Sequence, residues 1–269
     1  MFFRLLLSGA PAAAALLLTS CFSDSRANGH GGDPDGESIT FQETVRKDDD
    51  VRIVKTLVQM RAGELSIRGG ADDLMDGEFI VPDPEFEPEV SYRRRNDEGR
   101  LEIVQSNRGD IAIGGNRRNV WHLRFNERTP MELDIELPAG TADLRLGDLN
   151  LEKIEVDAGA GELKLDLRGT TARRLDINTG VGQVYVDLSG EWDHDFGAEL
   201  NGGIGEVTLV LPRDVGVRVD LAGLGSVDAD RGFIKDGNEY RNEVYGDSPH
   251  TLRIEVNGAL GSVSLELAD

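Results

Sequence analysis

Residues 159–167 read GAGELKLDL: two glycines on either side of an alanine, followed by leucines at every second position. Similar elements occur at 62–65, 140–144, 180–182, 203–205, 223–225 and 259–263, most of them ahead of a stretch in which apolar and polar residues alternate. An alternation with a period of two predicts strands that bury one face and expose the other. A recurrence roughly every 20 residues predicts a repeat architecture.

The paired glycines predict tight corners between successive strands. Glycine accepts a positive φ without a Cβ penalty and allows stacked backbones to approach closely. We therefore assign structural corner positions to Gly159, Gly161, Gly180, Gly182, Gly203, Gly205, Gly223 and Gly225. A dinucleotide-binding glycine loop is excluded, because each GxG element runs into another strand and lacks the third glycine.

Two all-β folds satisfy this pattern. In a β-solenoid, similar to a single-stranded parallel β-helix with about 20 residues per coil, the inward Leu, Val and Ile residues form apolar ladders. In an antiparallel β-sandwich, the same strands would form hairpins with the glycine corners at one end. The constant coil length and the shared phase of the corners favour the solenoid.

The composition divides the chain into four parts. We expect a signal peptide at 1–20, a flexible acidic tether at 21–50, the first part of a β-domain at 51–140, and the GxG coils at 141–269. The polar composition of the second part cannot bury enough apolar surface to offset the entropy of ordering. Within the last part, Asp236-Gly237-Asn238 is a turn signal that predicts a projecting hairpin insertion at about 230–248.

The first 21 residues have the layout of a secretory signal, with Arg4 ahead of an apolar stretch. The signal-recognition residues Leu18, Thr19 and Ser20 and the single cysteine, Cys21, resemble the bacterial lipobox. This resemblance implies that Cys21 becomes the N-terminus and carries palmitate-type acyl chains, which would anchor the protein to a bilayer. A membrane-spanning anchor and an ordinary signal peptide are the alternatives. By the same analogy, Phe22 in place of Asp favours the outer membrane in a Gram-negative cell.

Charge excludes one partner class and indicates another. A net charge of −21 repels the phosphates of nucleic acid and so disfavours that ligand. The segment 91–130 is nevertheless positive, and it contains a candidate anion or partner patch of Arg93, Arg94, Arg95, Arg117 and Arg118. Such a patch could contact anionic headgroups or an acidic partner, or it could only protect a strand edge from aggregation.

Catalytic signals are weak in this sequence. The four histidines form no recognisable triad or metal motif, so we expect no catalytic residues, no metal and no cofactor. The densest polar cluster is the loop Glu191–Asp195, whose acids, His194 and Trp192 could hold a cation or grip a sugar. The simpler interpretation is a solvated connection between coils, with Trp192 packed over the edge.

Further motifs are the run Arg61–Ala71, Leu74, Gly77-Glu78-Phe79, Pro88-Glu89-Val90, Met131–Ile135 and the repeated GxGE. Together these motifs resemble the toast-rack domain, which is related to LiaF-like envelope proteins and to the putative-adhesin group of domains of unknown function. The resemblance covers about residues 51–269. It implies a parallel β-solenoid at or outside the membrane, with roles in envelope stress sensing or adhesion and no established catalysis.

These observations lead to one expectation and one alternative. We expect a noncatalytic lipoprotein of the bacterial cell envelope that presents a β-solenoid surface to an envelope protein or glycan. The alternative is a carbohydrate-binding or polysaccharide-cleaving β-helix protein that uses the Glu191–Asp195 loop.

Overall fold

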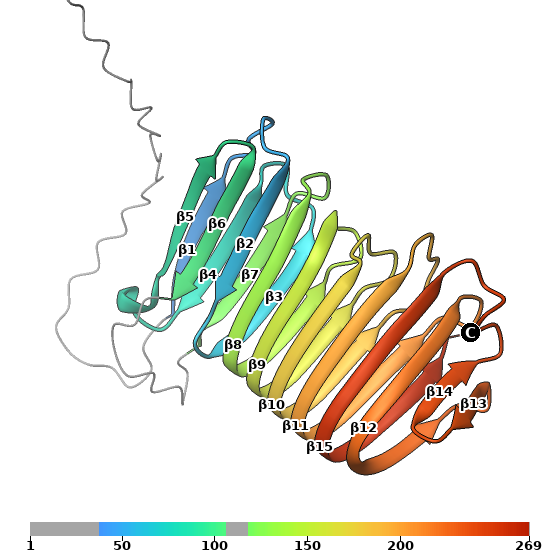
Figure 1. Ribbon diagram of the computed structural model, residues 1–269. Coiled ribbons are helices and arrows are strands. Elements are labelled where there is room, and N and C mark those ends of the chain that lie inside the picture. The colour runs from blue at the N-terminus through green and yellow to red at the C-terminus, as the bar shows by residue number, and fades with distance from the viewer. Residues whose placement is uncertain (1–37, 106–117, 269) are drawn as a thin grey trace, which may run out of the picture. The chain divides into compact units, whose positions relative to one another are not determined.

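The computed structural model describes residues 38–105 and 118–268, which belong to one compact unit built almost entirely of β-strands (Figure 1). The lipobox residues, Cys21 and Arg117 lie outside the described residues. The strands are β1 (Ile39–Val45), β2 (Ile53–Gln59), β3 (Gly63–Gly69), β4 (Met75–Val81), β5 (Pro88–Arg95), β6 (Glu98–Gln105), β7 (Val120–Phe125), β8 (Met131–Arg145), β9 (Leu151–Asp166), β10 (Arg174–Asp187), β11 (Phe196–Leu211), β12 (Gly216–Ala229), β13 (Phe233–Asp236), β14 (Glu239–Asn242) and β15 (Thr251–Leu267).

The six long strands, β8 to β12 and β15, bend at their glycine corners and stack in parallel (Figure 1). Register partners are 21 residues apart where Ala139 meets Ala160 and where Ala160 meets Val181, and 23 apart where Val181 meets Ile204. The first halves of the bent strands form one layer and the second halves form another, which we call the first layer and the second layer. The predicted solenoid of about 20 residues per coil is confirmed.

Alternation places the core between the two layers. Leu133 and Ile135 of β8 and Leu163 and Leu165 of β9 are at most 2% exposed, and they belong to one continuous apolar cluster that runs through the stack. The residues between them in sequence point outward. In the described part of the chain, no helix is long and apolar enough to cross a bilayer; a single 3-10 turn occurs at Pro84–Phe86.

A ladder of glycines lines the corners. The positions of Gly63, Gly140, Gly161, Gly182 and Gly205 follow one another from coil to coil. A Cβ atom on any of the last four would overlap the carbonyl oxygen of the glycine in the preceding coil. Gly161 and Gly182 also have φ values of +140° and +154°, which L side chains rarely adopt. Both close backbone approach and a positive φ therefore require glycine here.

The N-terminal end of the stack departs from the simple repeat. β2 and β3 form one coil beside β8, and β6 and β7 form the next coil outward. Beyond them, β5, β4 and β1 add in antiparallel orientation. The prediction that a tether extends to Asp50 was wrong for β1, because Ile39, Phe41 and Val45 place apolar side chains at every second or fourth position and pack against the core.

The C-terminal end also differs from expectation. The hairpin of β13 and β14 forms at the Asp236-Gly237-Asn238 turn, but it pairs antiparallel with β12 and extends the first layer instead of projecting. β15 lies between β11 and β12. Asn242 of β14 is buried, donates to the carbonyl oxygens of Pro212 and Val215, and accepts from the N–H of Val217. Because β14 occupies the outer edge of β12 in the first layer, a complete coil can pair only with the inner edge of β12.

Candidate interaction surface

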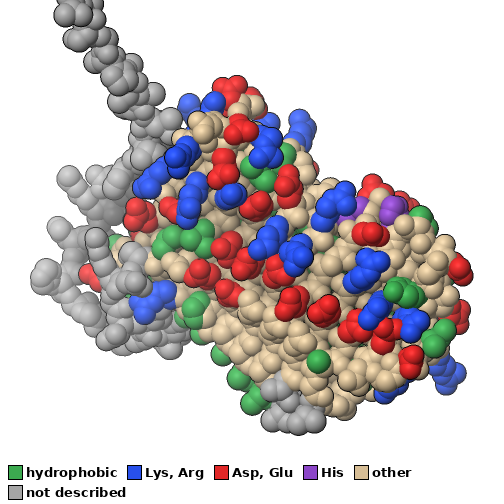
Figure 2. All heavy atoms as spheres, in the orientation of Figure 1, with side chains coloured by type: hydrophobic (Ala, Val, Ile, Leu, Met, Phe, Trp, Pro, Cys, Tyr) green, Lys and Arg blue, Asp and Glu red, His purple; other side chains and the backbone are tan. Residues whose placement is uncertain are grey.

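The outer face of the first layer carries charges in rows, with one residue from each strand. An acidic row consists of Asp134, Glu155, Asp176, Glu199, Glu255, Asp220 and Glu239, each in register with the next. Two positions away, a second row contains Lys55, Lys153, Arg174, Arg253, Arg218 and Arg241, with Glu132 and Gly197 as exceptions. Figure 2 shows red and blue side chains interspersed over this face. Neighbouring strands in a sheet lie about 4.8 Å apart, so the charges repeat at that interval.

The two rows neutralise each other locally. Lys153 Nζ lies 2.6 Å from Glu155 and 3.6 Å from Asp176, which belongs to the next coil. Arg218 likewise contacts Asp220 at 2.9 Å and Glu239 at 2.8 Å. Exposed pairs of this kind each stabilise a fold by about 0.2–1 kcal/mol at most. Their main effect is a face of regularly spaced donors and acceptors.

Asp134 has the least favourable electrostatic environment described for the acidic row. Burial removes water from its carboxylate, and Glu155, Glu136 and Asp157 repel it, so its pKa is raised above the ordinary value although Lys153 opposes the shift. Since the folded state binds this proton more tightly than the unfolded state, ionisation of Asp134 weakens the fold at neutral pH, and the loss is relieved as pH falls through the folded pKa.

Replacing Asp134 by Asn should therefore stabilise the protein at neutral pH by about 0.5 kcal/mol, a small value because the side chain is partly solvated. The gain should shrink near pH 3, where the wild-type carboxyl is protonated in both states. Urea unfolding midpoints at the two pH values measure this difference. An Asn variant that is equally or less stable at neutral pH would contradict the assignment.

A ladder of side-chain amides borders the acidic row. Asn178 Nδ2 donates to Asp157 Oδ1 at 2.7 Å, Asn201 Nδ2 to Asn178 Oδ1 at 3.1 Å, and Asn257 Nδ2 to Asn201 Oδ1 at 3.1 Å. Such amide ladders form where identical positions of parallel strands stack in register. This ladder was not predicted from the sequence. The signal was present, because Asp157, Asn178 and Asn201 each stand two residues before the first glycine of a corner.

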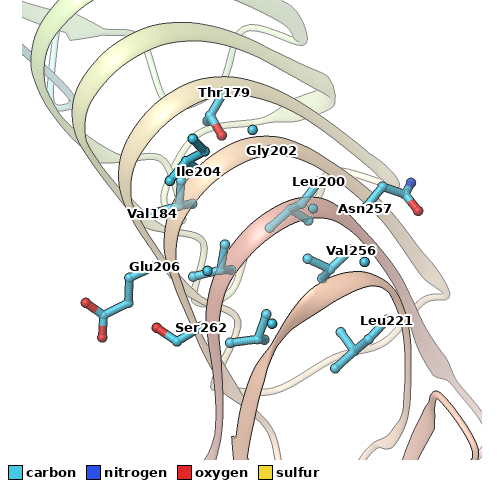
Figure 3. Close-up of a pocket in the computed structure, with 18 of the residues that line it drawn as sticks. Thr179, Val184, Leu200, Gly202, Ile204, Glu206, Leu221, Val256, Asn257 and Ser262 are labelled. Carbon is cyan, nitrogen blue, oxygen red and sulfur yellow. The ribbon is translucent and has the colours of Figure 1, made fainter.

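An apolar cavity of about 90 Å³ lies inside the bends at the C-terminal end of the stack (Figure 3). Leu200 of β11, Val256 of β15 and Leu221 of β12 line it and point into the bend, whereas Glu206 and Asn257 point away. One inward-pointing residue of each coil is in register with Leu163, and the exposed fraction of these residues rises towards this end of the stack. Leu163 is 2% exposed, Val184 is 6% exposed and Val227 is 38% exposed. Nothing in the sequence pattern singles out this cavity, since inward apolar residues continue without a break.

The Glu191–Asp195 loop is held by structural contacts. Trp192 is buried, packs against Phe196 with ring centroids 4.9 Å apart, and donates from Nε1 to the Leu188 carbonyl at 2.9 Å. His194 places Nε2 2.9 Å from the Ala172 carbonyl and Nδ1 2.8 Å from Asp193. Asp195 accepts from the N–H of Thr251 at 2.9 Å. Within residues 38–105 and 118–268, no group of three His, Cys, Asp or Glu side chains is placed to hold a metal ion.

The candidate arginines lie on different parts of the N-terminal end. Arg93, Arg94 and Arg95 end the edge strand β5, beside the start of β6, and Arg94 contacts Asp48 and Asp50 at 3.1 and 3.2 Å. Arg118 is exposed and comes after the end of β6 in the chain. The β5 arginines lie beside the start of β6, and the eight residues of this strand separate its two ends by roughly 20 Å. The structure therefore separates Arg118 from the β5 arginines, and the anion-binding role of the three on β5 stays a prediction.

Comparison with known proteins places this architecture in a family. A sequence profile of the N-terminal domain of toast_rack, DUF2154, matches residues 34–174 and 154–210. This chain belongs to the toast-rack family. Toast-rack membership agrees with the stack of bent strands, and it confirms the resemblance seen in the Arg61–Ala71 run and the GxGE motifs.

Two solved structures are similar to the toast-rack chain. A "putative cell adhesion protein" from Clostridium sporogenes is 28% identical and superposes with a TM-score of 0.66, and the match covers 86% of this chain and all of that one. A "putative adhesin" from Bacteroides fragilis is 11% identical with a TM-score of 0.38, covering 87% of this chain and all of that one. No curated protein matches the sequence.

Proposed function

We propose that this chain is a noncatalytic, lipid-anchored protein of the bacterial cell envelope that uses its stacked β-domain for adhesive contacts. The similarity to the Clostridium protein, which is named for cell adhesion, supports this role. The observation that carries it is the outer face of the first layer, where rows of paired charges and amides repeat from coil to coil. Such a face suits many shallow contacts, whereas catalysis requires a concave site with convergent polar groups.

The same geometry disfavours the carbohydrate-enzyme alternative. In the Glu191–Asp195 loop, His194 and Asp195 make contacts that join neighbouring coils, and Trp192 donates to Leu188 within its own connection. A sugar or cation would have to compete with these contacts for the same atoms.

Lipid attachment at Cys21 is the second part of this proposal. β1 is the first strand of the unit and lies at the end opposite to β12. Acyl chains on Cys21 would attach the protein to the bilayer, and more than one chain gives lasting attachment.

Expression in a non-adherent bacterial host tests the proposal. Wild-type protein should take up a palmitate analogue, fractionate with membranes and increase retention of cells on polystyrene and on a lawn of the same cells. Cys21→Ala should lose the label and the retention. Gly182→Ala, which leaves the anchor intact but disrupts the stack, should keep the label and lose the retention. Retention that is unchanged in both variants would refute the adhesive role.

A further inference from the structure

The second layer ends in an open strand edge. β14 pairs with β12 only at Arg218–Asp220, and Leu221 N–H donates to Asn238. Beyond the corner, residues 225–228 are all exposed, and in the described part of the chain β15 is the only strand that pairs with them. Asp230 N–H donates to Leu265 of β15 at 2.9 Å. Successive residues of a strand direct their N–H and C=O groups to opposite sides, so Val227 and Ala229 direct theirs away from β15, towards the unpaired side of β12.

The apolar cavity lies directly behind this edge. β12 is the outermost coil that lines it, through Leu221 and Val227. Of the four large apolar side chains that are strongly exposed among the described residues, Ile204 and Val227 line this cavity at 53% and 38% exposure. An apolar cavity of about 150 Å³ accommodates benzene, so one of 90 Å³ suits a single branched aliphatic side chain.

The outward residues of the edge set the charge of a partner. Ser226 and Asp228 are exposed and lie on the outer face of the second layer, in register with Ser262 and Ser264 of β15. Asp228 occupies the position that Asp143 holds in β8. A strand added beside Asp228 would therefore gain from basic side chains on its outward face.

We propose that this end of the stack docks an extended segment of a partner protein in which basic and aliphatic residues alternate, and that an aliphatic side chain of the segment enters the cavity. Backbone hydrogen bonds to Val227 and Ala229 supply the affinity, and the cavity and Asp228 supply the selectivity. This inference rests on the proposed adhesive function and names its partner chemistry. The docking end is the end of the stack opposite to β1.

Synthetic peptides test the site directly. We would measure fluorescence anisotropy of three labelled nine-residue peptides with the full chain carrying Cys21→Ala in mild detergent. The first peptide alternates Lys with Val, the second alternates Asp with Val, and the third alternates Lys with Ser. The first should bind with a Kd of roughly 10–500 μM, and the other two at least about 10-fold more weakly, since each lacks one recognition element.

Variants of the edge locate the binding. Ala229→Pro removes an edge N–H, and Leu221→Trp fills the cavity, so each should weaken binding of the first peptide at least about 10-fold. Asp228→Lys should weaken it several-fold even if the other two variants melt early. Asp143→Lys, the matched change in β8, should leave binding unchanged. No binding at millimolar peptide, or equal binding by Asp228→Lys and Asp143→Lys, would overturn the site. The assay needs neither anchor nor cells, so its failure leaves the adhesion result standing.

Discussion

Gly182→Ala should destabilise the protein by more than about 3 kcal/mol or prevent folding. A Cβ atom at Gly182 would overlap the carbonyl oxygen of Gly161 in the preceding coil, and the φ of +154° is itself unfavourable for alanine. Relief requires the two coils to separate at the corner, which breaks the parallel ladder on both sides. The measurement is a thermal or urea unfolding transition of the full chain.

Gly197→Ala is the matched control for this change. Gly197 lies on the outer face of β11, its φ is not in the left-handed region, and an added Cβ would meet only the Arg173 carbonyl at 4.0 Å. We expect this variant to be neutral or more stable by up to about 1 kcal/mol, because alanine lowers the entropy of the unfolded chain. Equal destabilisation by both substitutions would show that the corner ladder has no special role.

Trp192→Ala should cost about 3–5 kcal/mol of stability. The side chain is 8% exposed and packs against Phe196, and its removal leaves the Leu188 carbonyl without its donor. Trp192 therefore stabilises the fold, although it belongs to the loop that the sequence indicated as a possible sugar or cation site.

Asp193→Asn distinguishes this structural role from a binding role. The Asp193 side chain is 98% exposed, so the substitution should leave the urea unfolding midpoint nearly unchanged. If the loop held a cation or a sugar, calcium or an oligosaccharide would stabilise the wild-type protein, and Asp193→Asn would abolish that stabilisation. Thermal shifts with calcium and with oligosaccharides decide between the two.

The repeat was predictable because its physical requirements are local. A glycine that needs positive φ, as at Gly161, and alternating leucines, as at Leu163 and Leu165, appear in sequence within a few residues of each other. The hairpin turn at Gly237, whose φ is +62°, is equally local. These features fixed the strands, the corners and the coil length.

The order of the coils was not predictable in the same way. Each coil presents the same GxG element and the same alternation, so β15 satisfies its pattern equally well beside β11 or beyond β12. The choice depends on Asn242, whose buried amide fixes β14 on the outer edge of β12. The cavity depends on how inward side chains from four strands fill one bend, a property that no single stretch of sequence contains.

Disulfide trapping tests the parallel stack most directly. In a Cys21→Ala background, cysteines at Lys164 and Tyr185 should form a disulfide readily, because these residues are register partners on the outer face of the second layer. Cysteines at Lys164 and Asp176 should not, because Asp176 lies on the outer face of the first layer. An antiparallel hairpin between the same segments would reverse the outcome, with the Lys164–Asp176 pair oxidising and the Lys164–Tyr185 pair remaining reduced.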